Sequence, residues 1–218
     1  MITYILLDLD GTITNPKEGI TKSVQYALKH MGIVVDDLDS LCKHIGPPLK
    51  DGFREFWNLN EEEALQAVMK YREYYSVTGI LQNVEYEGME ELLQKLIEEG
   101  KQLIVATCKP EFYAKQIMEH FELSKYFIDI CGSSMDGSRS SKGDVIQYAL
   151  EKNHITRLDQ VVMVGDRLHD MEGAKENEIA SIGVLYGFGG REELVNAGAG
   201  QIAETVEELE RILIQRKE

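Results

Sequence analysis

The sequence contains few prolines and cysteines and no long apolar stretch. Its 218 residues include 4 prolines and 3 cysteines, which are Cys42, Cys108 and Cys131. These cysteines are odd in number and form no Cys-x-x-Cys pair, so we expect a reduced, cytoplasmic location. No apolar run approaches the ~18 residues of a transmembrane helix, and no basic leader precedes the first apolar run. We therefore expect neither a membrane span nor a signal peptide.

Basic residues are also scarce. The chain has 23 Lys and Arg against 38 Asp and Glu, for a formal net charge of -15, and it has no block of basic residues. This balance argues against a nucleic-acid partner. With 43% hydrophobic residues the chain can build a real core, either as one large domain or as a domain with an inserted module. A monomer and a homodimer both fit.

The most informative segment begins at Ile5 and runs through two aspartates into a glycine turn. Apolar residues up to Leu9 fit a short buried strand, and Asp8 and Asp10 lie at its carboxyl end. Ligands bind at that end of the strands in open α/β sheets. Buried acids are costly unless a cation or hydrogen bonds compensate them. The segment therefore predicts a functional site, whereas an isolated Asp-Gly would indicate only a turn.

Further segments repeat this construction. The apolar run 102–106 leads into Thr107, and the run 160–164 leads into Gly165-Asp166 and then Asp170. Lys142 opens a helical stretch between them. If the sheet is parallel, these side chains all face one edge. Acids that can hold a divalent cation, with a hydroxyl and an ammonium group that can hold an anion, predict a site for phosphoryl transfer.

This order of motifs resembles the signature of the haloacid dehalogenase superfamily. The matching elements are DxDGT at 8–12, Thr107, Lys142 and GDxxxD at 165–170. The likeness is strongest to its phosphoglycolate phosphatase group, including 5'-nucleotidase-like members. It implies an α/β fold, a Rossmann-like three-layer sandwich with a central parallel sheet and an inserted α-helical cap domain. It also implies a phosphoric monoester hydrolase.

The resemblance assigns roles to the acids. Asp8 is implied as the nucleophile that forms an aspartyl-phosphate, and Asp10 as general acid and then general base. Mg²⁺ is implied as the cofactor, held by Asp8, the Asp10 backbone carbonyl and Asp166. Asp170 is implied to orient the metal ligands or Lys142. Because dehalogenases of the superfamily lack the second aspartate, Asp10 favours hydrolysis of a phosphate ester.

Thr107 and Lys142 are implied to hold the transferring phosphoryl group, Thr107 through its hydroxyl and Lys142 through its charge. Simpler interpretations are a helix cap for Thr107 and a solvated lysine for Lys142. Candidate substrate contacts are less defined. They are Thr12, Cys108, Lys109, Arg167 and Arg54. Lys109 and Arg167 could bind a substrate anion or pair with the neighbouring carboxylates.

The chain between Asp10 and Thr107 is far longer than the dozen or so residues, plus a helix, that a parallel crossover needs. Helical spacing is seen at 19–31 and 61–76, and Asn60 with Glu63 fits an N-cap. We therefore expect a catalytic core of residues 1–15 and 85–218 and a helical cap of residues 16–84. In the family this cap is mobile and selects the substrate. Its candidate contacts are Lys22, His44, Lys50 and Arg54.

Strand and helix signals alternate after the insert. We expect helices at 88–99, 111–121, 143–152, 192–197 and 206–215, and strands ending at Cys108, Gly132, Val164 and Leu185. The glycine-rich segment 187–190 lacks the spacing of a nucleotide-binding fingerprint and is expected to form a flexible loop beside the site.

The sequence leaves the substrate open between 2-phosphoglycolate and nucleoside 5'-monophosphates, as small phosphorylated metabolites. A phosphosugar mutase on the same core is an alternative, because it differs in retaining the phosphoryl group. A non-catalytic phosphate-binding regulatory module is another, although the complete set of motif residues argues against it.

Overall fold

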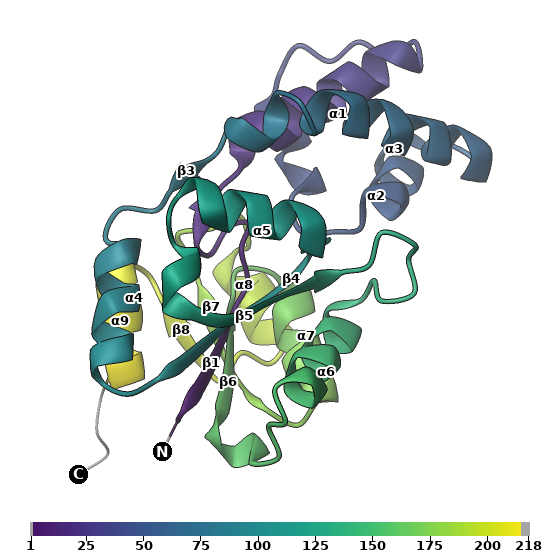
Figure 1. Cartoon of the computed structure of the whole chain (residues 1–218). Helices are drawn as coiled ribbons and strands as arrows, with labels where there is room; N and C mark the ends of the chain where they lie inside the picture. The colour runs from purple at the N-terminus through teal and green to yellow at the C-terminus, as the bar shows by residue number, and fades with distance from the viewer. Residues whose placement is uncertain (1, 215–218) are drawn as a thin grey trace. The chain divides into compact units, whose positions relative to one another are not determined.

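The computed structural model describes residues 2–214, and the chain divides into two compact units (Figure 1). The core unit comprises Met1–Thr14 and Glu85–Glu218, and the inserted unit comprises Asn15–Val84. The chain leaves the core through β2 (Thr14–Asn15) and returns through β3 (Val84–Glu85), and these strands pair as a small sheet. No helix among the described residues is long and apolar enough to cross a membrane.

The core unit is built on a six-stranded sheet in the order β5-β4-β1-β6-β7-β8, with every neighbouring pair parallel. Its strands are β1 (Tyr4–Leu7), β4 (Gln102–Pro110), β5 (Phe127–Ser133), β6 (Val161–Gly165), β7 (Ala180–Val184) and β8 (Gln201–Ala203). This confirms the predicted α/β, Rossmann-like class, because the order along the sheet is that of the Rossmann fold. The order reverses between β1 and β6, and ligands bind at such a switch point.

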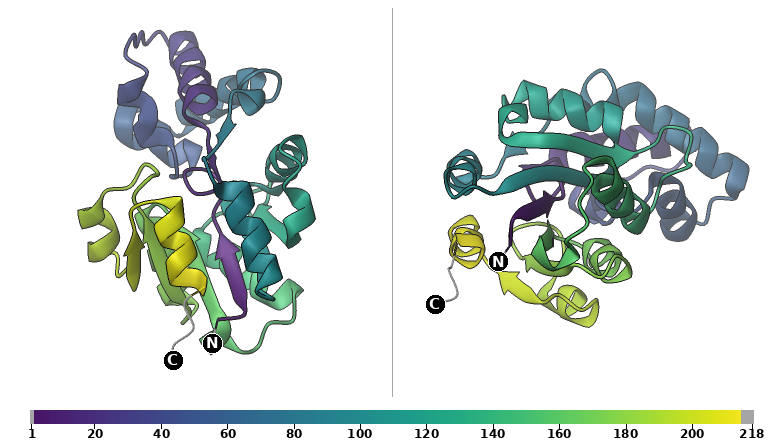
Figure 2. Two further views of the ribbon diagram at one scale, coloured as in Figure 1. Left: turned by 90° about the vertical axis from the view of Figure 1, so that its left-hand side faces the viewer. Right: turned by 60° about the horizontal axis from the view of Figure 1, so that its bottom comes forward.

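The strands of this sheet are nearly continuous apolar runs because both faces are covered. Leu6, Ile104 and Met163 lie on one face, in a buried cluster with Val145 and Ala149 of α6. The right-hand view of Figure 2 shows α6 (Lys142–Lys152) and α7 (Leu168–Glu176) on one side of the sheet. It shows α4 (Met89–Glu98) and α9 (Val206–Ile214) on the other. The remaining core helices are α5 (Glu111–His120), which packs on β4 and β5, and α8 (Arg191–Asn196).

The inserted unit is helical. It contains α1 (Lys17–His30), α2 (Leu49–Trp57) and α3 (Glu61–Tyr75), with α3 packed on both α1 and α2. The predicted cap of α3 is confirmed: the Asn60 side chain accepts from the amides of Glu62 and Glu63, and the Glu63 side chain accepts from the Asn60 amide. Short 3₁₀ turns complete the fold at Asp39–His44, Gly79–Leu81, Ser124–Tyr126 and Leu158–Gln160.

Most predicted elements are present within one to three residues, but α2, α7, β8 and the two-residue strands β2 and β3 were not predicted. Helix α2 contains Gly52, α7 buries only short stretches around Met171 and Ala174, and β8 has three residues. None of them offers a long apolar period. The last expected helix, 206–215, is observed as Val206–Ile214, and position 215 lies outside the described residues.

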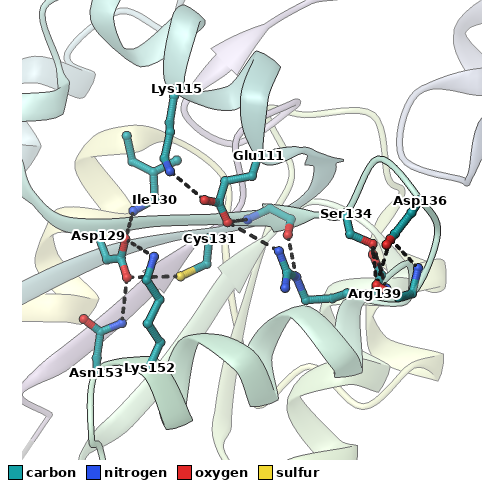
Figure 3. A network of polar contacts seen from close by, with 12 residues as sticks. Glu111, Lys115, Asp129, Ile130, Cys131, Ser134, Asp136, Arg139, Lys152 and Asn153 are labelled. Atoms are coloured by element: carbon teal, nitrogen blue, oxygen red, sulfur yellow. Dashed lines mark hydrogen bonds and ion pairs between the residues drawn. The ribbon is translucent and has the colours of Figure 1, made fainter.

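A polar network anchors the end of β5 and the loop that leads into α6 (Figure 3). Arg139 donates from Nε to the carbonyl oxygen of Gly132 at 2.8 Å, and its guanidinium lies 3.6 Å from the ring centre of Tyr148. Glu111, at the start of α5, lies 3.4 Å from the same guanidinium and pairs with Lys115. The network fixes the backbone that leads to Lys142, the first residue of α6.

Candidate active site

Asp8 follows β1 directly and continues its pairing with β6. Its amide donates to the carbonyl oxygen of Val164 at 2.9 Å, and its Oδ1 accepts from the amide of Leu9 at 2.8 Å. Gly11 turns the chain behind it with a φ of +86°, which favours glycine. A Cβ atom at Gly11 would lie 2.1 Å from Oδ2 of Asp166, so the turn also needs glycine for space. Close packing of this turn brings the first motif against Asp166.

The Lys142 ammonium group is buried between two carboxylates. Its Nζ lies 2.9 Å from Oδ1 of Asp8 and 2.8 Å from Oδ1 of Asp170, and it donates to the carbonyl oxygen of Ala106 at 2.9 Å. Burial alone lowers the pKa of a lysine, but the two carboxylates outweigh it and the pKa of Lys142 is raised. The side chain is positioned from the first turn of α6, where Ser141 caps the helix. Lys142 is therefore a cation fixed beside Asp8.

Lys109 pairs with the second aspartate of the first motif. Its Nζ lies 2.6 Å from Oδ2 of Asp10, and both side chains are largely buried. Burial raises the pKa of the Asp10 carboxyl, and the Lys109 ammonium opposes that rise. The other oxygen, Oδ1, is buried and accepts no hydrogen bond from the described residues. Of the two roles expected for Lys109, the structure shows the one with a carboxylate partner.

Asp166 is fully buried at the end of β6. Its Oδ2 accepts from the amide of Phe188 at 2.8 Å, and its Oδ1 has no hydrogen-bond partner among the described residues. Burial raises the pKa of Asp166 well above its ordinary value, and the carboxylates of Asp170 and Asp8 add to the rise. An isolated ionised carboxylate at such a position is strongly disfavoured. The nearby Arg167 charge opposes this rise in the pKa of Asp166.

The charges of the site fit a divalent cation. Carboxyl oxygens of Asp8, Asp166 and Asp170 lie within 4.8 Å of one another. Among the described residues, the Lys109 ammonium group pairs with Asp10 and the Lys142 ammonium group pairs with Asp8 and Asp170, whereas Asp166 accepts from the amide of Phe188. If all four carboxyl groups are ionised, these four carboxylates and two ammonium groups have a net charge of −2. Hard oxygen ligands with this net negative charge suit Mg²⁺.

Hydroxyl and thiol groups lie in the last residues of β4, at Thr107 and Cys108, and in the turn after β1, at Thr12. Thr107 is buried, and its Oγ1 accepts from the amide of Lys109 at 3.2 Å. The Oγ1 of Thr12 is buried and has no hydrogen-bond partner among the described residues. Cys108 is a free thiol whose pKa burial raises to about 12, so it is no nucleophile at neutral pH.

The two arginine candidates are paired elsewhere. Nε of Arg167 lies 2.8 Å from Oε1 of Glu193, which also accepts from the amide of Leu168 at 2.9 Å. Arg54 belongs to α2 of the inserted unit, where it lies 3.5 Å from Glu61. Lys22 and Lys50 also form ion pairs within that unit, and His44 is buried there beside Trp57. Within the core unit, contacts and electrostatic interactions join Asp8, Asp10, Cys108, Lys109, Lys142, Asp166 and Asp170, and the charge of Arg167 acts on Asp166.

Sequence reasoning missed two supporting groups, the backbone amide of Phe188 and the carboxylate of Glu193. Glycines on both sides of Phe188 were visible in the sequence, but glycines indicate a close approach without naming the partner. Glu193 lies in the first turn of α8 and reaches back to α7, a helix that was not predicted.

The assembled groups can carry out attack on an electrophilic phosphorus. One carboxylate, Asp8, is fixed beside an ammonium group, and a second, Asp10, lies two residues on with one oxygen held by Lys109. Asp166 and Asp170, which could hold a dication together with Asp8, lie close to it. The arrangement supplies a nucleophile, a proton-transfer group and positive charge for a phosphoryl group.

The chain is similar in sequence and in structure to known proteins. Residues 5–184 match the family model for haloacid dehalogenase-like hydrolases. A 5'-nucleotidase from Pseudomonas aeruginosa is 45% identical over 190 residues, which is 87% of this chain and 86% of that protein. The tyrosine-protein kinase PtkA from Mycobacterium tuberculosis is 37% identical over 212 residues, 96% of this chain and 72% of the kinase. The structure of a predicted phosphatase from Clostridium acetobutylicum matches with a TM-score of 0.96 at 50% identity, covering 98% of this chain and 99% of that one.

Proposed function

The chain belongs to the haloacid dehalogenase-like hydrolase family and is a phosphoric monoester hydrolase, and on this basis we propose a Mg²⁺-dependent phosphatase of small phosphorylated metabolites that works through an aspartyl-phosphate. The observation that carries the proposal is the position of Asp8. It lies at the end of β1, beside the switch point, in contact with the Lys142 ammonium and among acids suited to a dication.

Asp8 is the proposed nucleophile. Its carboxylate attacks phosphorus and displaces the leaving oxygen, and water then hydrolyses the mixed anhydride. Lys142 holds one Asp8 oxygen and lies where it can neutralise charge on the phosphoryl group. Thr107 is proposed to donate its hydroxyl to the same group, because it follows Ala106, whose carbonyl oxygen accepts from Lys142.

Asp10 is the proposed general acid and base. It gives a proton to the leaving oxygen and later takes one from the attacking water. Burial favours its protonated form, which the first of these steps requires. Lys109 fixes one Asp10 oxygen at 2.6 Å and leaves the other for proton transfer.

Asp8, Asp166 and the backbone carbonyl of Asp10 are the proposed Mg²⁺ ligands. Bound there, the cation supplies Lewis acidity and neutralises the charge of a phosphoryl oxygen. Asp170 contacts Lys142 at 2.8 Å, which supports a role in orienting that lysine. The buried, unpartnered Oδ1 of Asp166 supports its role as a ligand.

Nucleoside 5'-monophosphates are the leading substrates and 2-phosphoglycolate the second. The 45% identity with a 5'-nucleotidase over most of both chains supports this order. The inserted unit, Asn15–Val84, is proposed to be a mobile cap that supplies substrate contacts, with Arg54 as a candidate. The free cysteines support a cytoplasmic location.

The test is phosphate release from a substrate panel, with Mg²⁺ and with a chelator. The panel contains nucleoside 5'-monophosphates, 2-phosphoglycolate, hexose phosphates and pyrophosphate. We expect metal-dependent hydrolysis, fastest for the nucleoside monophosphates and absent in Asp8→Asn. The absence of turnover in folded, metal-loaded protein would refute the phosphatase proposal.

The same panel distinguishes the alternatives. A phosphosugar mutase isomerises a sugar phosphate without net phosphate release, and a regulatory module binds phosphate esters without turning them over. The likeness to PtkA adds one further assay, transfer of a phosphoryl group from ATP to protein tyrosine. Transfer that exceeds hydrolysis would replace the phosphatase proposal with a kinase.

A further inference from the structure

The segment Tyr186–Gly189, between β7 and α8, contacts both the first motif and Asp166 within the core unit. The Tyr186 hydroxyl donates to the backbone carbonyl oxygen of Thr12 at 3.2 Å, and the Phe188 amide donates to Oδ2 of Asp166 at 2.8 Å. The segment is tied to the sheet immediately before this, where the amide of Leu185 donates to the carbonyl oxygen of Ala203. It therefore joins the two motifs that flank the switch point.

Two glycines allow this approach. A Cβ atom at Gly187 would lie 2.4 Å from Cβ and 2.5 Å from Oδ2 of Asp166, and one at Gly189 would lie 1.9 Å from the Asp166 carbonyl oxygen. Such separations are far inside van der Waals contact, so any side chain at either position displaces the segment from Asp166. Gly190 differs, because a Cβ atom there would meet nothing within 4 Å.

The consequence for Asp166 is an asymmetric carboxylate. One oxygen, Oδ2, is held by a backbone amide, which is a rigid donor. The other, Oδ1, is buried and has no hydrogen-bond partner among the described residues. Phe188 and its flanking glycines therefore select which oxygen of Asp166 remains to bind a ligand.

We propose that Tyr186–Gly189 is a metal-positioning segment that makes Asp166 a one-oxygen ligand and so favours Mg²⁺ over Ca²⁺. Mg²⁺ requires near-ideal octahedral coordination, whereas Ca²⁺ accepts more ligands and bidentate carboxylates. A carboxylate with one oxygen held by an amide presents the single oxygen that suits the smaller ion. Residues that hold a metal ligand in this way typically change metal affinity by about 10- to 100-fold when mutated. The inference rests on the proposed Mg²⁺ site.

The experiment is calorimetric titration of the chelator-treated, full-length protein with Mg²⁺ and, separately, with Ca²⁺, without substrate. In Gly187→Ala and Gly189→Ala we expect the Mg²⁺ Kd to rise at least about tenfold, and the Ca²⁺ Kd to change less than about threefold. The matched control, Gly190→Ala, keeps both Kd values within about twofold of the wild type. Circular dichroism confirms that each variant is folded.

If both alanine variants misfold, a further variant that adds no Cβ atom beside Asp166 still tests the inference. Phenyllactate incorporated in place of Phe188 by nonsense suppression replaces the backbone N–H with an ester oxygen. We expect this variant to bind Mg²⁺ more weakly than the wild type does, with a smaller loss of affinity for Ca²⁺. Unchanged Mg²⁺ affinity in the folded variants, or equal weakening of both cations, would overturn the inference. If the wild type binds no Mg²⁺, both the inference and the proposed metal site fail. Loss of turnover in a protein that still binds Mg²⁺ affects only the proposed function.

Discussion

Lys142 is the residue whose charge most clearly links stability and activity. Its ammonium group is buried and lies within 3 Å of oxygens from Asp8, Asp170 and Ala106. Removing one partner of a buried ion pair leaves an uncompensated charge and costs about 3–5 kcal/mol. The same group faces the place where phosphoryl charge develops in the proposed mechanism.

We therefore predict that Lys142→Met lowers kcat about 10²- to 10³-fold and lowers the free energy of unfolding by about 3 kcal/mol. Mg²⁺ should restore part of that stability, because it supplies positive charge to the same carboxylates. Urea unfolding with and without Mg²⁺ measures this. Lys152→Met removes a half-exposed partner of Asp129 and should cost at most about 1 kcal/mol. Wild-type kcat in Lys142→Met would contradict the role.

We predict that Lys109 acts on the substrate through Asp10, and the choice of leaving group tests this. An alkoxide must be protonated as it leaves, whereas p-nitrophenolate leaves without a proton. Lys109→Met releases the Asp10 carboxyl from its 2.6 Å contact. We predict a fall in kcat/KM, which reports only formation of the aspartyl-phosphate, of about 10²-fold for a nucleoside monophosphate and about threefold or less for p-nitrophenyl phosphate.

Lys115→Met, which removes a surface partner of Glu111, is the control and should leave both rates unchanged. Equal losses for the two substrates would show that Lys109 does not act through proton transfer.

At the scale of elements, the inserted unit contains a histidine that links its 3₁₀ turn to α2. The His44 side chain is buried, and its Nε2 accepts from the Trp57 indole N–H at 2.9 Å. Burial lowers the pKa of His44 to about 4, and the neighbouring Lys43 charge adds to this. Because an indole N–H only donates, protonating Nε2 also breaks this hydrogen bond.

A depressed histidine pKa stabilises the fold above the unfolded pKa of 6.5, and this stability is lost as the pH falls towards about 4. The loss for His44 is on the order of 3 kcal/mol. We predict that the wild type loses more unfolding free energy between pH 6.5 and 4.5 than His44→Gln, which keeps an acceptor but does not titrate. Denaturation followed by Trp57 fluorescence measures the difference. His30→Gln, on the exposed face of α1, should keep the wild-type slope, and an identical slope in His44→Gln would refute the prediction.

The junction of β5, α5 and α6 depends on Arg139 (Figure 3). Its guanidinium bonds to Gly132, lies against Tyr148 and approaches Glu111. Arg139→Met should therefore lower the unfolding free energy by about 1–2 kcal/mol in urea titrations. Arg157→Met breaks an exposed pair with Asp159 and should cost less than about 0.5 kcal/mol. A similar cost for both variants would show that the Arg139 contacts are not stabilising.

At the scale of the whole molecule, the sequence predicted the parallel sheet, and it pointed to a candidate site at the carboxyl ends of its strands. It could do so because the carboxyl ends of parallel strands meet at one edge, so residues after separate strands converge. Asp8 and Asp166 each follow an apolar strand directly, and Thr107 lies in the last residues of β4, after its apolar run. Position at the carboxyl end of a strand thus predicts that these side chains lie at one edge of the sheet.

The sequence did not decide which partners the side chains and loops take. It left Lys109 between a substrate anion and a neighbouring carboxylate, and the structure places its ammonium group 2.6 Å from Asp10. The contact of Phe188 with Asp166 could not be predicted, because it is made by a backbone amide that every residue except proline has. Helix α7 was missed because its buried face is interrupted by Gly173 and by polar Asp170. Asp170 is buried there for its contact with Lys142. A residue placed for chemistry obscures the apolar period that predicts a helix.

The proposed mechanism requires Asp8 to carry the phosphoryl group. Asp10→Asn offers the most direct test, because p-nitrophenyl phosphate can form the intermediate without an acid, whereas hydrolysis of the intermediate lacks its base. Acid-quenched Asp10→Asn protein should show one burst of p-nitrophenolate per enzyme, and mass spectrometry should find the phosphoryl group on the peptide that contains Asp8. The same protein with Asp8→Asn added should show neither. A phosphoryl group on another residue, or steady turnover without any phosphorylated protein, would contradict the account.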